Sequence, residues 1–247
     1  MEKNRYEILE TPVDVVDMQT ALAWIADAVK QRTTPGFVLA VNPEKVFALR
    51  RDSALKRFFE QAYLLIPDGI GIVKALHILY GIKVSRIPGA DLMQQICADA
   101  PRSGYRIFIY GANEHVSGKV CEILKQRYPG IQIIGRSNGF VKTENMPELI
   151  DRINMSCADI LFIAMGSPKQ EQWMEEYAGR LTTVRICQGI GGTLDTIVGT
   201  VKRAPLFWQK LELEWFYRLL CQPRRFKRQL RCFKFAFEVY LQKFFKK

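Results

Sequence analysis

Short apolar runs alternate with longer amphipathic stretches over roughly the first 200 residues of the chain. The apolar runs are rich in β-branched residues, which is typical of strands buried on both faces. The stretches between them have helical spacing and length, so the pattern predicts βαβ units and an α/β fold. The expected architecture is a Rossmann-like, mostly parallel sheet flanked by helices. We expect strands at 37–41, 63–66, 106–110, 131–134, 159–165 and 184–188, and helices near 18–31, 43–61, 69–80, 90–99, 114–127, 144–156 and 168–179.

A different pattern begins near residue 200. No further strand is expected there, because aromatic and basic residues dominate the sequence. One helix is predicted over 206–221 and a second over about 224–245, since Pro223 breaks the helical pattern between them. We therefore expect an α/β domain over residues 1–200 and a helical appendage over 201–247.

The second tail helix combines an apolar stripe with a basic side. A basic amphipathic helix of this kind is expected to lie in the interface of an anionic membrane. The alternative is that the stripe packs on the domain or on a neighbouring subunit. The stripe consists of Phe226, Leu230, Phe233, Phe237, Leu241 and Phe244, and the basic side of Arg224, Lys227, Arg228, Arg231 and Lys234.

The net charge of +11 belongs almost entirely to this appendage. Residues 201–247 hold thirteen Lys or Arg and three Glu, so they carry +10 of the total. Such a concentration of positive charge favours an anionic partner: a phospholipid surface, a nucleic acid or a phosphorylated substrate.

The composition excludes several classes of protein. Hydrophobic residues make up 48% of the 247 positions and charged residues 25%, which is ordinary for a globular chain. No stretch reaches the roughly 20 apolar residues of a spanning helix. The first ten residues lack the apolar core of a signal peptide, so we expect a cytoplasmic protein. Six single cysteines and two histidines predict neither a disulfide scaffold nor a metal site.

Asp68 is the most interesting carboxylate in the chain. It follows the apolar run 63–66 and precedes Gly69 and Gly71, so we expect it at the carboxyl end of a strand. In open α/β sheets, ligands bind beyond these strand ends. A carboxylate there could accept a proton from an attacking hydroxyl group. The alternative is a helix N-cap, because aspartate is favoured at that position.

Further candidate ligand-binding residues stand at other turns. The loop 166–171 joins an apolar strand to a helix, where backbone N–H groups, Ser167 and Lys169 could hold a phosphate. The alternative is a well-capped connection. The turn 189–192 is rich in glycine but is neither a dinucleotide fingerprint nor a P-loop. Each of the remaining turn residues could instead be a turn or cap residue; these are Asn42, Arg86 and Asp91.

The chain contains no Asp-x-Asp pair, the usual carboxylate grip on a metal–nucleotide diphosphate. If a nucleotide sugar is the substrate, arginines rather than a divalent ion are expected to neutralise the leaving diphosphate. We therefore expect neither a metal nor another cofactor.

Eight motifs together resemble one family in their order and spacing. They are Asn-Pro-Glu (42–44), Pro-Asp-Gly-Ile-Gly (67–71), Arg-Ile-Pro-Gly-Ala-Asp (86–91), Gly-Ser-Pro-Lys-Gln-Glu (166–171), Gly-Gly-Thr-Leu-Asp (191–195), Lys-Arg-Ala-Pro (202–205), Leu-Glu-Trp-Phe-Tyr-Arg-Leu (213–219) and Gln-Pro-Arg-Arg-Phe-Lys-Arg-Gln (222–229). The resemblance is to the WecG/TagA/CpsF glycosyltransferases and covers nearly the whole chain. The tail is most similar to the enterobacterial-common-antigen branch, and the teichoic-acid branch is the near neighbour.

The resemblance implies a bacterial inverting transferase that needs no metal. It would move a mannosamine-type sugar, with N-acetylmannosaminuronate favoured, from UDP to undecaprenyl-diphosphate-linked N-acetylglucosamine. This reaction belongs to cell-surface polysaccharide synthesis, on the cytoplasmic face of the inner membrane. The UDP-sugar is a co-substrate rather than a cofactor. A homo-oligomer is also implied, without a residue that selects its size.

The resemblance also assigns roles to residues. Asp68 matches the family's proposed general base, and Ala40 replaces a family threonine. The tail arginines Arg218, Arg225 and Arg228 match residues thought to close over the active site and meet the diphosphate. The residues expected to bind substrate are Asn42, Arg86, Asp91, Gly166, Ser167, Lys169, Gln170, Gly191 and Gly192.

Other functions remain open from the sequence. A nucleic-acid-binding protein could use the basic tail for phosphates and its aromatic rings for stacking. The continuous apolar stripe argues against exposed stacking rings, so we expect no nucleic-acid partner. A non-catalytic scaffold that recruits polysaccharide enzymes is a second rival. Among enzymes, the donor sugar could instead be N-acetylmannosamine, glucose or another hexose.

Overall fold

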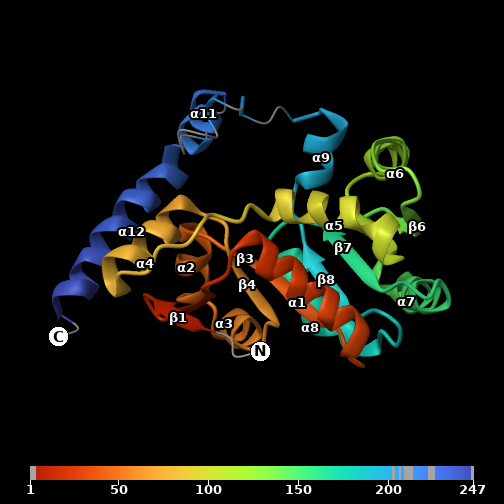
Figure 1. The fold of residues 1–247 in the computed structure, drawn as a ribbon, viewed down its shortest axis with the longest axis horizontal. Helices are drawn as coiled ribbons and strands as arrows, with labels where there is room; N and C mark the ends of the chain where they lie inside the picture. The colour runs from red at the N-terminus through yellow and green to blue at the C-terminus, as the bar shows by residue number, and fades with distance from the viewer. Residues whose placement is uncertain (1–3, 202–203, 206, 209–213, 222–225, 246–247) are drawn as a thin grey trace.

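The computed structural model describes residues 4–201, 204–205, 207–208, 214–221 and 226–245. Its centre is a sheet with the strand order β4-β3-β8-β7-β5-β6, in which all neighbouring strands are parallel (Figure 1). This confirms the expected α/β, Rossmann-like fold. The strands are β3 (Gly36–Val41), β4 (Leu64–Pro67), β5 (Arg106–Gly111), β6 (Gln132–Ser137), β7 (Ile160–Ala164) and β8 (Ile186–Gly189).

Helices cover both faces of the sheet and bury two apolar cores. One core lies under α1 (Met18–Gln31), α5 (Gly89–Ser103), α6 (Glu114–Arg127) and α9 (Thr193–Val198). The other lies under α2 (Pro43–Leu49), α3 (Ser53–Glu60), α4 (Ile70–Tyr80), α7 (Met146–Met155) and α8 (Lys169–Tyr177). Strands β4, β7 and β8 are buried along their whole length, which explains the unbroken apolar sequences of β4 and β7, whereas β8 also buries the polar Gln188.

The six expected strands are all present, with ends shifted by at most three residues. The sequence did not predict the hairpin of β1 (Arg5–Ile8) and β2 (Thr11–Asp14). Its two-residue turn places Leu9 and Glu10 at φ values of 48° and 62°, without the asparagine or glycine that normally signals such a turn. The short helix α9 was missed as well.

The single helix expected over 43–61 is in fact two helices. Helix α2 ends at Leu49, and Asp52 starts α3 by accepting hydrogen bonds from the N–H groups of Ala54 and Leu55, both at 3.0 Å. The capping carboxylate therefore decides a boundary that apolar spacing alone does not reveal.

The appendage contributes α11 (Glu214–Cys221) and α12 (Phe226–Phe245). Helix α12 packs alongside α4 and also contacts α2 (Figure 1). Its side facing the domain is anchored by Phe235 and Val239, which are buried although neither belongs to the expected apolar stripe. The described stripe residues are exposed instead: Phe233, Phe237, Leu241 and Phe244.

The helix is therefore apolar on two sides, a feature that the stripe alone did not predict. Arg231 and Lys234 are exposed, while Arg224 lies outside the described residues, as do the side chains of Phe226, Lys227, Arg228 and Leu230. No helix within the described part of the chain is both long and apolar enough to cross a membrane.

At the amino ends of the strands, Asp159 joins three neighbours. Its carboxylate accepts hydrogen bonds from the backbone N–H and the guanidinium of Arg106 at 2.8–3.0 Å, and its carbonyl accepts from Arg185 N at 2.8 Å and from Ile186 N at 3.2 Å. Burial raises the pKa of Asp159, but the Arg106 hydrogen bonds and charge outweigh it and hold that pKa below the ordinary value. The ionised form is therefore the one that the fold favours.

We expect Asp159→Asn to lower the free energy of unfolding by about 1–2 kcal/mol at pH 7, because a charge-assisted, partly exposed network is lost. The folded-state pKa is depressed, so the wild-type advantage should disappear as the pH falls through that pKa. Urea unfolding at pH 7 and pH 3 measures both effects.

The matched control is Asp99→Asn, which removes an i,i+3 pair with Arg102. It should change stability by less than about 0.5 kcal/mol at either pH. A wild-type advantage of Asp159 that persists unchanged at pH 3 would contradict the proposed linkage.

Candidate active site

Asn42 and Asp68 stand side by side at the carboxyl edge of the sheet. They directly follow β3 and β4, which pair with Val41 opposite Pro67. The Val41 carbonyl accepts hydrogen bonds from the N–H groups of Asp68 at 3.0 Å and Gly69 at 3.4 Å. The strand pairing itself therefore fixes the backbone that presents the half-buried Asp68.

Asp68 is not the N-cap of the following helix. Helix α4 begins after Gly69, and no side chain makes a capping hydrogen bond there. The cap interpretation applies to Asn42 instead, whose Oδ1 accepts from the Lys45 N–H at 3.0 Å to start α2. The N-cap positions at this edge are therefore occupied by Asn42 for α2 and Gly69 for α4.

The glycines of this turn let two chain segments approach closely. A Cβ on Gly69 would lie 2.8 Å from Pro43 Cδ, and one on Gly71 would lie 2.9 Å from Pro43 Cγ. Both positions therefore need glycine for space, because real Cβ atoms do not come that near to another side chain. The close contact holds the turns after β3 and β4 together.

Arg86 and Asp91 belong to the chain segment that passes over this edge. Ile87 donates its N–H to the Pro67 carbonyl at 2.9 Å, which ties the segment to the residue before Asp68. The buried Gln188 of β8 donates to the Gly89 carbonyl at 3.0 Å, and Ala40 lies beneath Gly89. Asp91 lies in the first turn of α5. Both predicted residues are therefore held beside the ends of β3, β4 and β8.

Arg86 forms an ion pair with Glu214 of the appendage, at 2.8 Å between Nη2 and Oε2. The Glu214 side chain is nearly buried and that of Arg86 is largely so. The expected substrate residue Arg86 is thus the docking point of α11 as well. Arg218 follows Glu214 by four residues in the same helix, and its side chain lies outside the description, as does Arg225 and the side chain of Arg228.

Helix α12 reaches the same edge through Phe235. This ring is 2% exposed, and a Cβ on Gly71 would lie 3.5 Å from its Cε1 atom. Farther along the helix, Gln242 Oε1 accepts from the Leu9 N–H at 3.0 Å, and Glu238 pairs with Arg50. The appendage therefore packs on the domain at Gly71, which follows Asp68 by three residues in the sequence.

The ends of β3, β7 and β8 are joined by a polar cluster in which Lys45, Gln170 and Glu171 are buried and Ser167 is exposed. Lys45 Nζ lies 2.6 Å from Glu171 Oε1 and also donates to the Ser167 hydroxyl. Gln170 Nε2 donates to the same glutamate oxygen at 3.2 Å, while its Oε1 accepts from Gly191 N at 3.0 Å. This cluster fixes both predicted turns, 166–171 and 189–192, relative to α2.

Glycine at position 189 makes room for this cluster, since a Cβ there would lie 2.5 Å from Gln170 Nε2. The remaining predicted residues surround it. Gly166 and Gly191 have positive φ values of 73° and 53°, Gly192 is the N-cap of α9, and Lys169 is exposed at the start of α8. Gln170 is buried, so in this structure its amide holds the Gly191 turn.

Sequence reasoning missed four residues of this region: Lys45, Glu171, Glu214 and Phe235. Glu171 ends the 166–171 motif and Lys45 directly follows the 42–44 motif, but their pairing joins positions 126 apart in sequence. Phe235 lies off the apolar stripe. Only the three-dimensional packing makes these residues part of the site.

Cysteine chemistry is not favoured here. Cys187 lies in the middle of β8, and burial raises the pKa of its thiol far above the ordinary value. Burial likewise raises the pKa of Cys97 in α5 to about 12. Both thiols therefore stay neutral at physiological pH and are poor nucleophiles. Within the described ranges, no three His, Cys, Asp or Glu side chains gather where they could hold a metal ion.

The arrangement suits proton abstraction beside a bound anion. Asp68 supplies a carboxylate at the end of β4, and Arg86 belongs to the segment that is hydrogen-bonded to Pro67, the residue before it. Ser167 and the amino end of α8 offer hydrogen-bond donors at the other end of the same edge. A base and an anion site on one edge are the parts that a transfer from a phosphorylated donor requires.

We expect Phe235→Ala to detach α12 from the domain. Removing a buried phenylalanine costs about 3 kcal/mol, so amide exchange over 232–245 should accelerate by about a hundredfold. The control is Phe237→Ala in the same helix, whose ring is 64% exposed and whose loss should leave exchange almost unchanged. Equal protection in both variants, measured by hydrogen-exchange mass spectrometry, would contradict this anchoring role.

Comparison with known protein families gives a match across almost the whole chain. It covers residues 6–247 and therefore includes the hairpin, the sheet, both glycine-rich turns and the appendage. The matched family is described as the glycosyl transferase WecG/TagA/CpsF family, whose members are glycosyltransferases of cell-surface polysaccharide synthesis. The chain belongs to the WecG/TagA/CpsF family of glycosyltransferases.

Proposed function

We propose that the chain transfers an N-acetylmannosamine-type sugar, with N-acetylmannosaminuronate favoured, from UDP to a polyprenyl-diphosphate-linked N-acetylglucosamine. The observation that carries this proposal is the half-buried Asp68 at the end of β4. Asn42 follows the neighbouring strand, Ile87 of the Arg86 segment is hydrogen-bonded to Pro67, and Phe235 of the appendage packs at Gly71, three residues after Asp68. The carboxyl edge of an open α/β sheet is a common binding site for nucleotides, which suits a UDP-sugar donor. The basic appendage suits an acceptor that is linked to a membrane lipid.

In the proposed reaction, Asp68 accepts the proton of the acceptor hydroxyl as its oxygen attacks the anomeric carbon. The bond between that carbon and the UDP oxygen breaks on the opposite face, so the configuration inverts. UDP leaves with the bonding electron pair as extra negative charge on its diphosphate. The tail arginines Arg218, Arg225 and Arg228 are proposed to stabilise this charge, without a metal ion.

The donor sugar is the finer part of the proposal. A uronate carries a carboxylate that needs a cationic partner, and Arg86 and the exposed Lys169 are candidates for it. Arg203, the third candidate, lies outside the described residues. The alternative donor within the same family is UDP-N-acetylmannosamine or another UDP-hexose, which would need no such partner.

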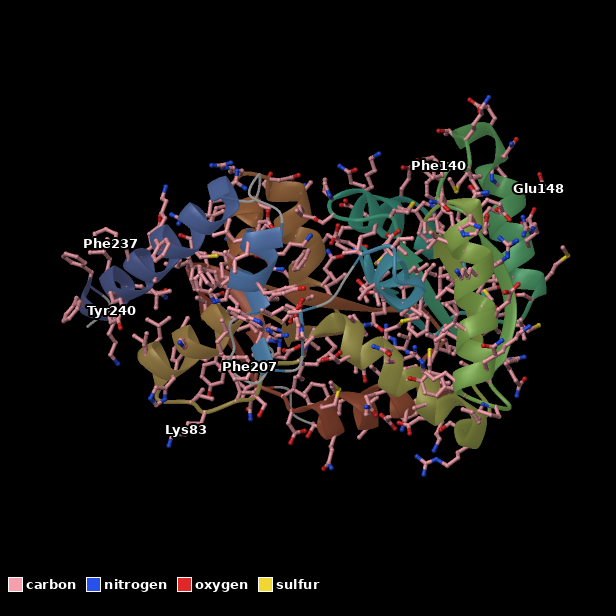
Figure 2. All side chains as sticks on the ribbon, turned by 90° about the horizontal axis from the view of Figure 1, so that it is seen from above. Lys83, Phe140, Glu148, Phe207, Phe237 and Tyr240 are labelled. Carbon is pink, nitrogen blue, oxygen red and sulfur yellow. The ribbon has the colours of Figure 1, made fainter. Side chains whose placement is uncertain are left out.

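The acceptor side of the proposal involves α12. Figure 2 shows Phe237 and Tyr240 pointing outward from this helix, at the end of the molecule opposite Phe140. Phe233, Leu241, Phe244 and Phe245 are exposed on α12 too, so one end of the molecule presents a large apolar surface. With Arg231 and Lys234 exposed nearby, this surface suits peripheral contact with an anionic bilayer.

We expect Asp68→Asn to lower kcat by about 10²- to 10⁴-fold, because the amide cannot accept the hydroxyl proton. The dissociation constant for UDP should stay within about twofold of wild type. The measurement is transfer from radiolabelled UDP-N-acetylmannosaminuronate and UDP-N-acetylmannosamine to the lipid-linked acceptor, with EDTA present, alongside calorimetry with UDP.

The control is Asp151→Asn, which changes an exposed carboxylate of α7 and should leave kcat unchanged. Full activity of Asp68→Asn would exclude the proposed base. Activity with one donor alone identifies the sugar, and loss of activity in EDTA would contradict the metal-independent mechanism.

We expect the double substitution Phe237→Ser and Phe244→Ser to weaken binding to anionic vesicles by at least tenfold. Each exposed ring contributes about 1.5–3 kcal/mol when it is transferred out of water. Co-sedimentation with phosphatidylglycerol-containing vesicles measures the partition. Phe140→Ser is the matched control, because this ring is 78% exposed and far from α12 (Figure 2). Equal weakening by the control would argue against a specific membrane-facing surface.

A further inference from the structure

Lys45 is a buried cation at the carboxyl edge of the sheet. The residue is 8% exposed, and its Nζ lies 2.6 Å from Glu171 Oε1 and 5.2 Å from the centre of the Phe59 ring. Glu171 is 1% exposed, and its second oxygen, Oε2, has no hydrogen-bond partner within the described residues. A lysine placed so deeply loses most of its rotamer freedom and points in one direction.

That direction leads to Ser167. The Lys45 ammonium has hydrogen-bond donors only, so the Ser167 hydroxyl oxygen must be the acceptor in their contact. The hydroxyl proton is consequently left to point away from Lys45. Ser167 is exposed in the turn after β7, next to Gly166 and the uncapped amino end of α8. The buried lysine therefore fixes the polarity of an exposed hydroxyl group.

We propose that Lys45 is a positioning residue that holds the Ser167 hydroxyl as a hydrogen-bond donor to a phosphate group of the UDP-sugar. This inference rests on the proposed function and adds a determinant of donor binding to it. Ser167 touches the donor, whereas Lys45 acts only through Ser167.

The surrounding contacts explain why the arrangement is preorganised. Glu171 compensates the charge of Lys45 and accepts from Gln170, which in turn holds Gly191. The turns after β7 and β8 are thereby fixed before any ligand arrives, so less entropy is lost when a phosphate binds. Because Glu171 neutralises Lys45, the group that would contact the ligand is the Ser167 hydroxyl and not the Lys45 ammonium.

The first arm of the test asks whether the Ser167 hydroxyl contributes to phosphate binding. Calorimetry on the full chain measures the dissociation constants for UDP and for uridine. Ser167→Ala should raise the dissociation constant for UDP about tenfold, because a hydrogen bond to a charged group is lost. It should leave uridine binding unchanged, since uridine has no phosphate. Ser167→Thr keeps the hydroxyl group and should restore UDP binding to within about threefold of wild type.

The second arm measures whether Lys45 acts through Ser167. The double variant Lys45→Met with Glu171→Gln leaves no unpaired buried charge. Lys45→Arg keeps a positive charge beside Glu171 and takes the place of the double variant if that variant does not fold. Each should weaken UDP binding about fivefold in wild type but by less than twofold in the Ser167→Ala background. The Michaelis constant for the donor should rise accordingly, while that for the lipid acceptor stays constant. Lys142→Met, at an exposed lysine, is the control.

The outcomes separate this inference from the proposed function. If wild type does not bind UDP, the proposed function fails. If wild type binds UDP and Ser167→Ala binds it equally well, or loses uridine binding to the same extent, the phosphate contact is wrong. If the Lys45 variants weaken UDP binding equally in both backgrounds, Lys45 does not act through Ser167.

Discussion

The pairing of β3 with β4 is the constraint on which the site depends. Because the Val41 carbonyl accepts from both Asp68 and Gly69, the turn after β4 is locked to the end of the neighbouring strand. Gly69 and Gly71 then allow Pro43 to pack against that turn without a clash. The Arg86 segment is attached to these strand ends through Ile87, and Phe235 packs at Gly71 in the same turn.

The appendage uses two faces of one helix for two purposes. Phe235 and Val239 attach α12 to the domain, and Phe237 and Phe244 on the other side stay in solvent. The proposed membrane contact and the packing of α12 on the domain therefore involve different side chains. The Arg86–Glu214 ion pair adds a second attachment of the appendage at this edge, through α11.

Much of the fold followed from apolar patterning because buried parallel strands are nearly continuous apolar runs. The hairpin of β1 and β2 was not predicted, because its turn residues Leu9 and Glu10 are not the asparagine or glycine that usually indicate such a turn. Motif order likewise indicated Asp68, Ser167 and Gly191 as residues of one site, because strand ends of a parallel sheet meet at one edge. Spacing could not decide whether Asn42 or Asp68 caps a helix, because both residue types do so equally well.

By itself, the sequence determined the α/β architecture, the family and the concentration of positive charge in the appendage. These properties depend on local periodicity and on motifs that are contiguous in the chain. Only the tertiary structure decided that Lys45 meets Glu171, that Arg86 meets Glu214 and that Phe235 rather than the apolar stripe anchors α12. Such pairings join residues far apart in sequence, and packing geometry, not local preference, selects them.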